Sequence, residues 1–301
     1  MNSSSGGFAR KKEPDERPRP RRLSVRSFGI TDQGKVRPAN EDQFLIAELT
    51  KTMTIAHTSL RGPSAVLGDE RGQLFLVADG MGGHAAGERA SALAVAVIEQ
   101  FTVNTFKWFL QDDDPGPDSA ASELAAAIDQ ADAAIMDESE AHPELSGMGT
   151  TLTLAYAVGT QLFVLHVGDS RAYLFRAGAL RQLTQDHTVV AEMVARGELR
   201  ADQASQHRLR HVITNVLGGR ERGVRAEAQV VDLEADDELL LCSDGLTEMV
   251  SAADITGILS AEEEPEQAAR RLIDLANERG GHDNVTVIVA RFEQPEAALS
   301  A

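Results

Sequence analysis

LFLVADG, at residues 74–80, is an apolar strand-like run that ends directly in Asp-Gly, and ELLLCSDG, at residues 238–245, repeats the pattern. A carboxylate at the end of a strand is held on rigid backbone, and the glycine after it lets a ligand approach the main chain closely. Two more aspartates lie at strand boundaries, because Asp169 follows one apolar run and Asp283 precedes another. A single Asp-Gly is a common turn. Four aspartates in comparable positions predict that acidic side chains gather at sheet edges.

Short runs of β-branched and aliphatic residues predict strands along most of the chain. They lie at Gln43–Ile46, Leu74–Ala78, Thr150–Ala157, Leu162–Val167, Ala172–Phe175, Ala228–Leu233, Glu238–Cys242 and Val285–Phe292. Apolar residues at helical spacing predict long helices in the middle of the chain and more helices toward its end. These helices span Glu88–Phe109, Ser119–Glu138, Thr188–Arg196, Ala252–Leu259 and Pro265–Glu278.

The connections between the central strands indicate how the sheets are built. Short turns separate the strands at 150–157, 162–167 and 172–175, so we expect an antiparallel meander rather than β-α-β units. Helices that interrupt a strand-rich chain then favour the α+β class, with helices covering β-sheets. Two polar segments, Thr50–Gly72 and Arg196–Arg225, are long enough to be functional or mobile insertions.

Composition predicts a globular protein whose body is strongly acidic. The chain of 301 residues is 42% hydrophobic and carries a net charge of −18, so its surface repels nucleic acid and anionic membranes. Its one cysteine, Cys242, lies in an apolar run, which favours packing over a reactive thiol and excludes an internal disulfide. No stretch is apolar enough to span a bilayer or to serve as a secretory signal, and we expect a soluble, cytoplasmic monomer.

Both ends of the chain differ from the body in composition. Residues 1–26 contain eight Lys/Arg, three Asp/Glu and three prolines, and we expect this basic tail to be disordered. The rest of the chain therefore carries −23. The tail is either a solvated leader or a docking or autoregulatory arm. Residues 294–301 are predicted to be a short C-terminal tail.

The acidic pattern favours hard divalent cations. Carboxylate oxygens without thiolate or paired histidine ligands suit Mg²⁺ or Mn²⁺ better than Zn²⁺. Two such ions ~3.5–4 Å apart can activate a water and neutralise charge on a phosphoryl group during in-line attack. No protein nucleophile is then required.

A further motif precedes the first predicted strand. Residues 31–42 read TDQGKVRPANED. The guanidinium of Arg37 could hold two phosphate oxygens, or it could be an ordinary surface cation. Glu41 and Asp42 likewise remain open between site residues and solvated turn acids.

Six segments together resemble the bacterial PPM/PP2C-type protein phosphatases in order and approximate spacing over roughly residues 27–292. They are Thr31–Asp42, Asp79–Ala90, Gly149–Thr151, Gly168–Arg171, Ser243–Leu246 and Gly281–Thr286. The resemblance implies an αββα sandwich of two antiparallel sheets flanked by helices, within a phosphatase domain spanning 27–293. It also implies a dinuclear Mg²⁺ or Mn²⁺ centre that hydrolyses phosphoserine and phosphothreonine, and a mobile flap at 184–219.

The resemblance assigns metal ligands by position. It implies that Asp79 bridges both ions and that the carbonyl of Gly80 binds the second ion. Asp244 and Asp283 would bind the first ion. Asp169 resembles the ligand of a third, weaker ion of the bacterial members.

Other motif residues receive supporting roles from the same resemblance. Glu41 would hold a water of the centre, and Asp42 would hydrogen-bond behind the ligands. Arg37 would take the substrate phosphate, and Asn284 would orient its neighbours.

The sequence differs from the eukaryotic branch of this family at the position of the proposed general acid. Met81 stands where that branch has a histidine proposed to protonate the leaving group. His84, three residues later, is either a proton donor or a helix-start histidine that hydrogen-bonds locally, and a water could serve instead. The spacing of the remaining histidines, including His166, His187, His207 and His211, indicates no role.

Two other functions remain as alternatives. One is a catalytically silent phosphopeptide-binding scaffold on the same fold, although all the aspartates of the dinuclear centre are present. The other is a specialised phosphatase that acts on an anti-sigma-factor antagonist. Phosphorylated proteins are the expected partners, and a Ser/Thr kinase and its targets are candidates among them.

Overall fold

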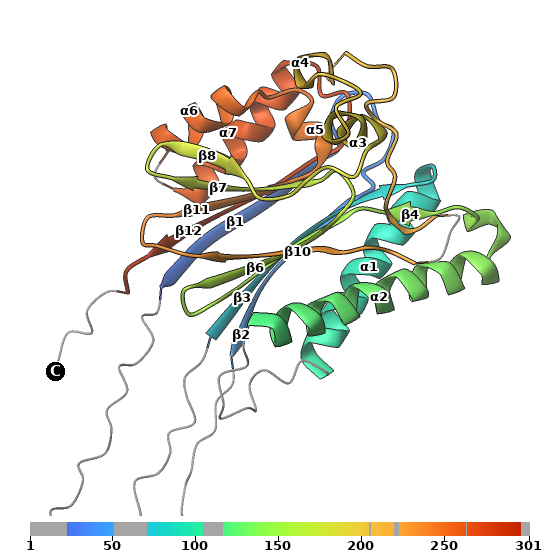
Figure 1. Cartoon of the computed structure of the whole chain (residues 1–301), viewed down its shortest axis with the longest axis horizontal. Coiled ribbons are helices and arrows are strands. Elements are labelled where there is room, and N and C mark those ends of the chain that lie inside the picture. Colours follow the sequence, from blue (N-terminus) through green and yellow to red (C-terminus); the bar gives the residue numbers. More distant parts are fainter. Residues whose placement is uncertain are drawn as a thin grey trace, which may run out of the picture.

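Two β-sheets lie face to face between helices in the protein (Figure 1). We describe this fold from a computed structural model, which covers residues 23–50, 71–104, 117–204, 206–219, 223–262 and 264–295. The strands pair antiparallel in both sheets. The predicted αββα sandwich of the α+β class is therefore confirmed.

Sheet I has the strand order β10-β6-β5-β3-β4-β9, with β2 also paired to β3. Its strands are β2 (Asp42–Thr50), β3 (Arg71–Met81), β4 (Gly149–Thr150), β5 (Leu152–Val158), β6 (Gln161–Val167), β9 (Leu217–Gly218) and β10 (Glu227–Asp232). Sheet II has the order β1-β12-β11-β7-β8. Its strands are β1 (Ser24–Asp32), β7 (Arg171–Arg176), β8 (Ala179–Gln182), β11 (Glu238–Cys242) and β12 (Val285–Glu293).

Each sheet carries its own helical cover. The helices α1 (His84–Asn104) and α2 (Pro117–Ala141) pack on sheet I, and α6 (Ala252–Ala261) and α7 (Pro265–Glu278) pack on sheet II (Figure 1). Shorter helices lie near the strand ends: η1 (Pro143–Leu145), α3 (Val189–Ala195), α4 (Ala201–Ala204) and α5 (Asp244–Thr247). Pro265 begins α7, and the Ser251 hydroxyl caps α6, so local sequence determines where both helices start.

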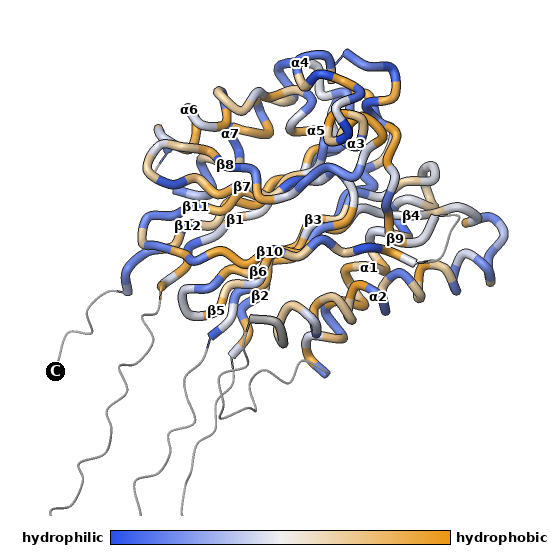
Figure 2. The backbone as a smooth tube through the Cα atoms, viewed as in Figure 1, coloured by the Kyte–Doolittle hydropathy of each residue, from blue (hydrophilic) through white to orange (hydrophobic). Residues whose placement is uncertain are grey.

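Alternation along the strands explains the continuous apolar runs of the sequence. In β3, Leu74, Leu76 and Ala78 pack against α1 and α2, whereas Phe75 and Val77 face sheet II. Successive side chains of a strand point to opposite faces, so a strand covered on both sides must be apolar at every position. Figure 2 shows that the residues of the inner strands are largely hydrophobic, as this rule requires.

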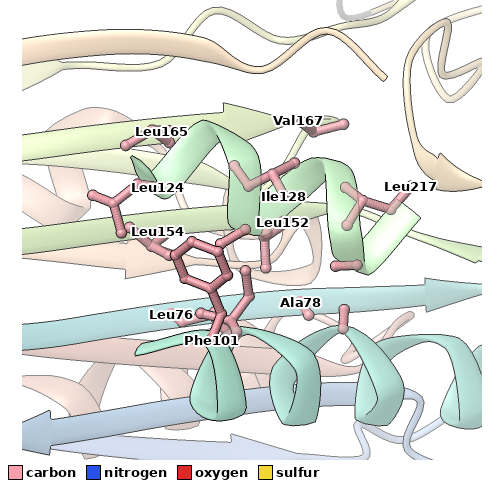
Figure 3. Packing of buried hydrophobic residues seen from close by; sticks show 14 of the residues in the cluster. Leu76, Ala78, Phe101, Leu124, Ile128, Leu152, Leu154, Leu165, Val167 and Leu217 are labelled. Atoms are coloured by element: carbon pink, nitrogen blue, oxygen red, sulfur yellow. The ribbon is translucent and has the colours of Figure 1, made fainter. Parts of the chain in front are cut away.

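Helices α1 and α2 close the core below sheet I. Phe101 of α1 and Leu124 and Ile128 of α2 lie against Leu152 and Leu154 of β5 (Figure 3). All five side chains are at most 5% exposed. This packing stabilises the sheet from which Asp79 projects.

The predicted meander is correct only for its first two strands. β5 pairs with β6, but β7 pairs with β11 in sheet II. The chain leaves sheet I through Gly168, whose φ of +111° favours glycine. The turn at 168–170 therefore crosses between layers instead of closing a hairpin.

Tertiary pairing also shifts the predicted N-terminal boundary. The basic tail was predicted to end at residue 26, but β1 begins at Ser24, which pairs with Glu293 of β12. Arg26 forms an ion pair with the same Glu293. Residues 1–22 and 296–301 lie outside the described residues, as does 51–70, which is most of one predicted insertion. Within the described ranges, none of the helices combines the length and apolarity that crossing a bilayer requires.

Candidate metal centre

Antiparallel pairing gathers the predicted acidic residues at one end of the sandwich. Asp42, the first residue of β2, is the Cα partner of Asp79, near the end of β3. Asp244 begins α5 directly after β11, and Asp283 lies just ahead of β12, which pairs with β11. In antiparallel strands the start of one meets the end of its neighbour. Residues far apart in the sequence therefore meet at one sheet edge.

Burial and mutual repulsion raise the pKa values of the central aspartates. The pKa of Asp79 lies well above its ordinary value because the carboxyl is desolvated and the charges of Asp42, Asp244, Asp169 and Asp283 act on it. The pKa of Asp244 is raised well above its ordinary value by the same two causes, desolvation first. Such a cluster is unfavourable unless cations neutralise it.

Asp42 is the most completely enclosed of these carboxyls. Burial raises its pKa to about 6, against the opposing effect of hydroxyl donors. The Ser243 hydroxyl donates to Asp42 Oδ2 at 2.8 Å, and the Thr286 hydroxyl donates to the same oxygen at 2.7 Å. Ser243 also accepts the backbone N–H of Thr286, at 2.9 Å. Asp42 is therefore held in place by Thr286 of β12 and by Ser243, the residue that follows β11.

Asp169 lies in the turn between β6 and β7. Burial raises its pKa to about 6, the charge of Asp186 adds to the shift, and the charge of Arg171 opposes it. Arg171 is held by Asp186 through two hydrogen bonds of 2.8 and 2.6 Å. The charge of Arg171 therefore offsets only part of the effect of burial on the pKa of Asp169.

The carboxylate oxygens of this cluster are suitable ligands for divalent cations. Asp42 Oδ1, Asp169 Oδ1 and Asp244 Oδ1 are buried and have no hydrogen-bond partner among the described residues. Buried carboxylate oxygens without donors are rare in proteins, because their desolvation is then uncompensated. Oxygen-rich clusters of this kind are the ligands that Mg²⁺ and Mn²⁺ accept.

The three predicted principal ligands are not gathered around a single point. Among the described residues, the one trio of candidate ligands whose atoms all lie within 4.8 Å of one another is His211, Asp244 and Glu248. Asp79, Asp244 and Asp283 are spread more widely than that.

Arg37 lies beside one predicted ligand. Its Nη2 donates to Asp283 Oδ2 at 2.6 Å, and its side chain is 51% exposed. The loops that carry the two residues are joined by the Lys35 N–H, which donates to the carbonyl of Gly281 at 2.7 Å. Gly34 has a φ of +75°, and a Cβ there would lie 2.2 Å from the Asp283 carbonyl oxygen. The sequence at 34–37 therefore requires glycine for this approach.

Asn284 holds the loop that leads into β2. Its Oδ1 accepts the Glu41 N–H at 2.9 Å, and its Nδ2 donates to the carbonyls of Gln33 and Ala39 at 2.9 and 2.8 Å. The predicted orienting role of Asn284 is consistent with these contacts. The side chain fixes both ends of the segment that carries Arg37.

Glycines bring α1 close to the centre. A Cβ at Gly80 would lie 2.2 Å from the Gly87 carbonyl oxygen, and one at Gly87 would lie 2.3 Å from Glu41 Oε2. The Glu41 side chain, 8% exposed, therefore reaches the start of α1. His84 is the first residue of this helix, and its side chain lies outside the described part of the structure.

A pocket opens beside the centre. It has a volume of ≈ 510 Å³, and its lining includes Asp169, Asp244, His211, Glu248 and Arg210. The segment 184–219, predicted to be a flap, supplies one wall of it. Its ends are anchored, because the Gly168 N–H donates to His187 Nδ1 at 3.1 Å and Asp132 Oδ1 accepts the Gly218 N–H at 2.7 Å.

Several residues of the site carried no sequence signal of their own. Ser243 and Thr286 belong to motifs that the sequence analysis identified, but that analysis assigned them no role. His211 and Glu248 form an ion pair only because the segment 184–219 brings His211 to the end of α5. Cys242 behaves as predicted, since it is fully buried and burial raises the pKa of its thiol to about 12.

Comparisons with known proteins identify the family of this chain. The sequence profile of the family described as protein phosphatase 2C matches residues 64–278. The serine/threonine protein phosphatase PstP of Mycobacterium tuberculosis H37Rv is 44% identical over 218 residues, which are 72% of this chain and 40% of PstP. The serine/threonine phosphatase stp of Listeria monocytogenes serotype 4b is 34% identical over 271 residues, covering 90% of this chain and 97% of stp.

Solved structures show the same fold. The crystal structure of M. tuberculosis PstP/Ppp has a TM-score of 0.72 and 38% identity, covering 90% of this chain and 99% of that one. The catalytic domain of PstP in complex with two manganese ions has a TM-score of 0.70, 38% identity and the same coverage. The chain spans 40% of the full length of the PstP proteins it matches.

Proposed function

Because the chain belongs to the protein phosphatase 2C family, we propose that it hydrolyses phosphoserine and phosphothreonine esters in proteins. Two Mn²⁺ or Mg²⁺ ions are its proposed cofactors. The observation that carries the proposal is the cluster of buried aspartates with raised pKa values and carboxylate oxygens without donors. A cluster of this kind is stable only when positive charge is bound to it.

The ligands are proposed from the positions of the carboxylates. Asp79, which experiences the charges of four other aspartates, would contact both ions, and the Gly80 carbonyl would contribute next to it. Asp244 and Asp283, carried by the ends of sheet II, would complete one ion's ligands. Bound cations supply positive charge to the phosphoryl group and make a water sufficiently nucleophilic to attack it.

Three groups of the chain prepare the centre. Asp42, held by Ser243 and Thr286, keeps a negative charge behind Asp79 and so strengthens cation binding. Asn284 fixes the loop that carries Arg37 and Glu41. Glu41 is proposed to position a water within the centre.

Arg37 is the proposed phosphate-binding residue. Its half-exposed guanidinium lies against Asp283 and can present a planar pair of N–H donors to phosphate oxygens. The body of the protein carries −23, so this cation offsets repulsion of the incoming anion. His84 remains a candidate donor of the proton to the leaving alkoxide.

The proposed substrates are phosphorylated proteins. The relatives named above are serine/threonine phosphatases, and a Ser/Thr kinase together with its targets is the proposed source of the substrates. We propose that the chain acts as a monomer. The domain is proposed to span 27–293, with β1 extending it to Ser24.

Phosphate release from a phosphothreonine peptide tests the function. The purified chain should release phosphate with Mn²⁺, lose activity in excess EDTA and recover it when Mn²⁺ is restored. The Asp79→Asn variant is the matched negative control, because it keeps the shape of the side chain and removes a proposed ligand. Peptide binding without phosphate release at any metal concentration would identify the silent scaffold instead. Full turnover in EDTA would exclude the dinuclear centre.

A further inference from the structure

The C-terminal end of α7 is hydrogen-bonded to the segment that carries Arg37. Asn277, in the last turn of α7, donates from Nδ2 to Asp32 Oδ1 at 3.0 Å. The same oxygen of Asp32 accepts the Gly34 N–H at 2.8 Å. Within the loop that follows, Gln33 Nε2 donates to the Arg37 carbonyl at 2.7 Å. Two side chains to which the sequence assigned no role therefore link a covering helix to the loop of the proposed phosphate-binding residue.

The same helix end leads directly to Asp283. After α7 the chain turns at Gly281, whose φ is +54° and whose N–H donates to the Ala276 carbonyl at 3.1 Å. A Cβ at Gly281 would lie 2.4 Å from Asn277 Oδ1, so the turn packs against the amide and requires glycine. Asp283, two residues later, accepts from Arg37 Nη2 at 2.6 Å. Asn277 thus lies against both segments whose side chains meet in this ion pair.

The backbone alone ends α7, so the Asn277 side chain is not needed as a cap. The Arg279 N–H donates to the Leu275 carbonyl at 3.1 Å, and the Gly280 N–H donates to the Asn277 carbonyl at 3.1 Å. Backbone donors of this kind satisfy the last carbonyls of a helix. An ordinary helix-end role therefore does not account for the bond from Asn277 to Asp32.

The amide of Asn277 is oriented by Asp32. Its Oδ1 is buried and has no hydrogen-bond partner among the described residues. A buried acceptor without a donor is unfavourable, so this amide contributes less to stability than a fully bonded one. The reverse orientation would place Oδ1 against the carboxylate of Asp32 and lose the one bond that the side chain makes in the described part of the chain.

We propose that Asn277 and Asp32 are positioning residues for phosphate binding, because together they fix Arg37 relative to Asp283. The proposal rests on the proposed function, in which Arg37 takes the substrate phosphate. Neither positioning side chain is proposed to touch the substrate. A phosphate must meet the guanidinium and the bound ions at the same time, so a small displacement of the Arg37 loop weakens binding.

Loss of the Asn277 bond should displace Arg37 more than Asp283. Asp283 Oδ1 accepts the Asn284 N–H at 2.8 Å, and β12 begins at Val285, directly after Asn284. These contacts hold the carboxylate in place without help from α7. The expected defect is therefore in substrate binding, with the metal ligands left in position.

Steady-state kinetics on a phosphothreonine peptide at saturating Mn²⁺ test the pair. Asn277→Asp keeps the size of the side chain but turns its donor into an oxygen that repels Asp32. It should raise KM roughly 3- to 10-fold and leave kcat within about 2-fold of the wild type. Asp32→Asn should keep the wild-type KM, because its carbonyl oxygen can accept the same two bonds. Asn104→Ala, which changes the exposed last residue of α1, is the control and should also keep it.

A double-mutant cycle with Arg37→Ala tests whether the effect passes through Arg37. In that background Asn277→Asp should raise KM no further, because the group that Asn277 positions is absent. A full additional increase in KM would overturn the positioning role. A wild-type KM for Asn277→Asp alone would overturn it as well.

Side-chain NMR of the full ¹⁵N-labelled chain in Mg²⁺ separates this inference from the proposed function, because it needs no turnover. The Arg37 Nε–H signal is assigned by its absence in Arg37→Ala. It should shift in Asn277→Asp and stay unchanged in Asn104→Ala. An unchanged signal in Asn277→Asp rejects the positioning role even if the wild type hydrolyses the peptide. A shifted signal in a protein that hydrolyses nothing supports the fixed position of Arg37 and rejects the proposed function.

Discussion

Replacing Asp42 by Asn should stabilise the metal-free protein while weakening its metal centre. Asp42 is 2% exposed, and one of its oxygens has no hydrogen-bond partner among the described residues. The other oxygen accepts from Ser243 and Thr286, and an asparagine carbonyl can accept the same two bonds. The amide group would then lie where the unpartnered oxygen was, close to the carboxyl group of Asp79. The substitution thus removes an unfavourable charge and keeps the shape.

The pKa of Asp42 gives the size of the effect. Burial raises it from 3.8 to about 6 in the folded state. A carboxyl group whose pKa is raised in the folded state stabilises the folded protein fully when the pH is below its pKa in the unfolded chain. This stabilisation is lost as the pH rises through about 6, the pKa in the folded state. At 1.36 kcal/mol per pKa unit, ionised Asp42 costs up to about 3 kcal/mol at neutral pH. Asn should recover about 1–3 kcal/mol, which corresponds to roughly 2 to 10 °C in Tm.

Urea denaturation in EDTA, followed by circular dichroism, measures the effect. Asp42→Asn should be more stable than the wild type at pH 7.5, and the difference should shrink toward zero as the pH falls from 6 to below 4. Added Mn²⁺ should reverse the order, because the wild type gains more binding energy. Asp132→Asn is the matched control, since that buried carboxylate accepts N–H groups from Gly218 and Gly223 and should lose stability. A destabilised Asp42→Asn at pH 7.5 would refute the reasoning.

Three further predictions concern the proposed centre and the chain's start. At saturating Mn²⁺, Asp79→Asn should lose more activity than Asp169→Asn, because Asp79 experiences the charges of four other aspartates; equal residual rates would contradict this ranking. Arg37→Ala should lower kcat/KM on a phosphothreonine peptide roughly 10- to 150-fold, and unchanged kinetics would reject the phosphate-binding role. Deleting residues 1–22 should leave the Tm unchanged, whereas deleting 1–26 should lower it, because the last three of these residues pair with β12; equal Tm values would argue against that pairing.

The local sequence predicted correctly those helices and strands that have a clear pattern of apolar residues or a clear start signal. β11 and α7 have the bounds that the sequence predicted. Residues 239–242 of β11 are all apolar because alternate residues face two different cores, and Pro265 determines where α7 starts. β1 was missed because its polar residues resemble those of the basic tail, and only pairing with β12 makes it a strand.

Part of the candidate site could likewise be predicted from the sequence, and the rest depends on the tertiary fold. The aspartates could be named from the sequence because each stands beside a strand with a glycine or asparagine next to it or near it. Burial and the charges of the other aspartates raise the pKa of Asp79, and these charges act on it only because antiparallel pairing returns distant segments to one edge. No local sequence pattern shows that these aspartates lie close together in the folded protein.

By its resemblance to a known family the sequence implied the αββα architecture, and by its local pattern it determined the α+β class, the acidic motifs and their order along the chain. Burial on both faces and turn chemistry are written into neighbouring residues, so these features could be predicted without coordinates. Only the tertiary structure decided that β7 joins sheet II, that Arg37 meets Asp283 and that His211 reaches Glu248. Each of these depends on the path of the chain between distant segments, and the packing of the whole fold, not local preference, selects that path.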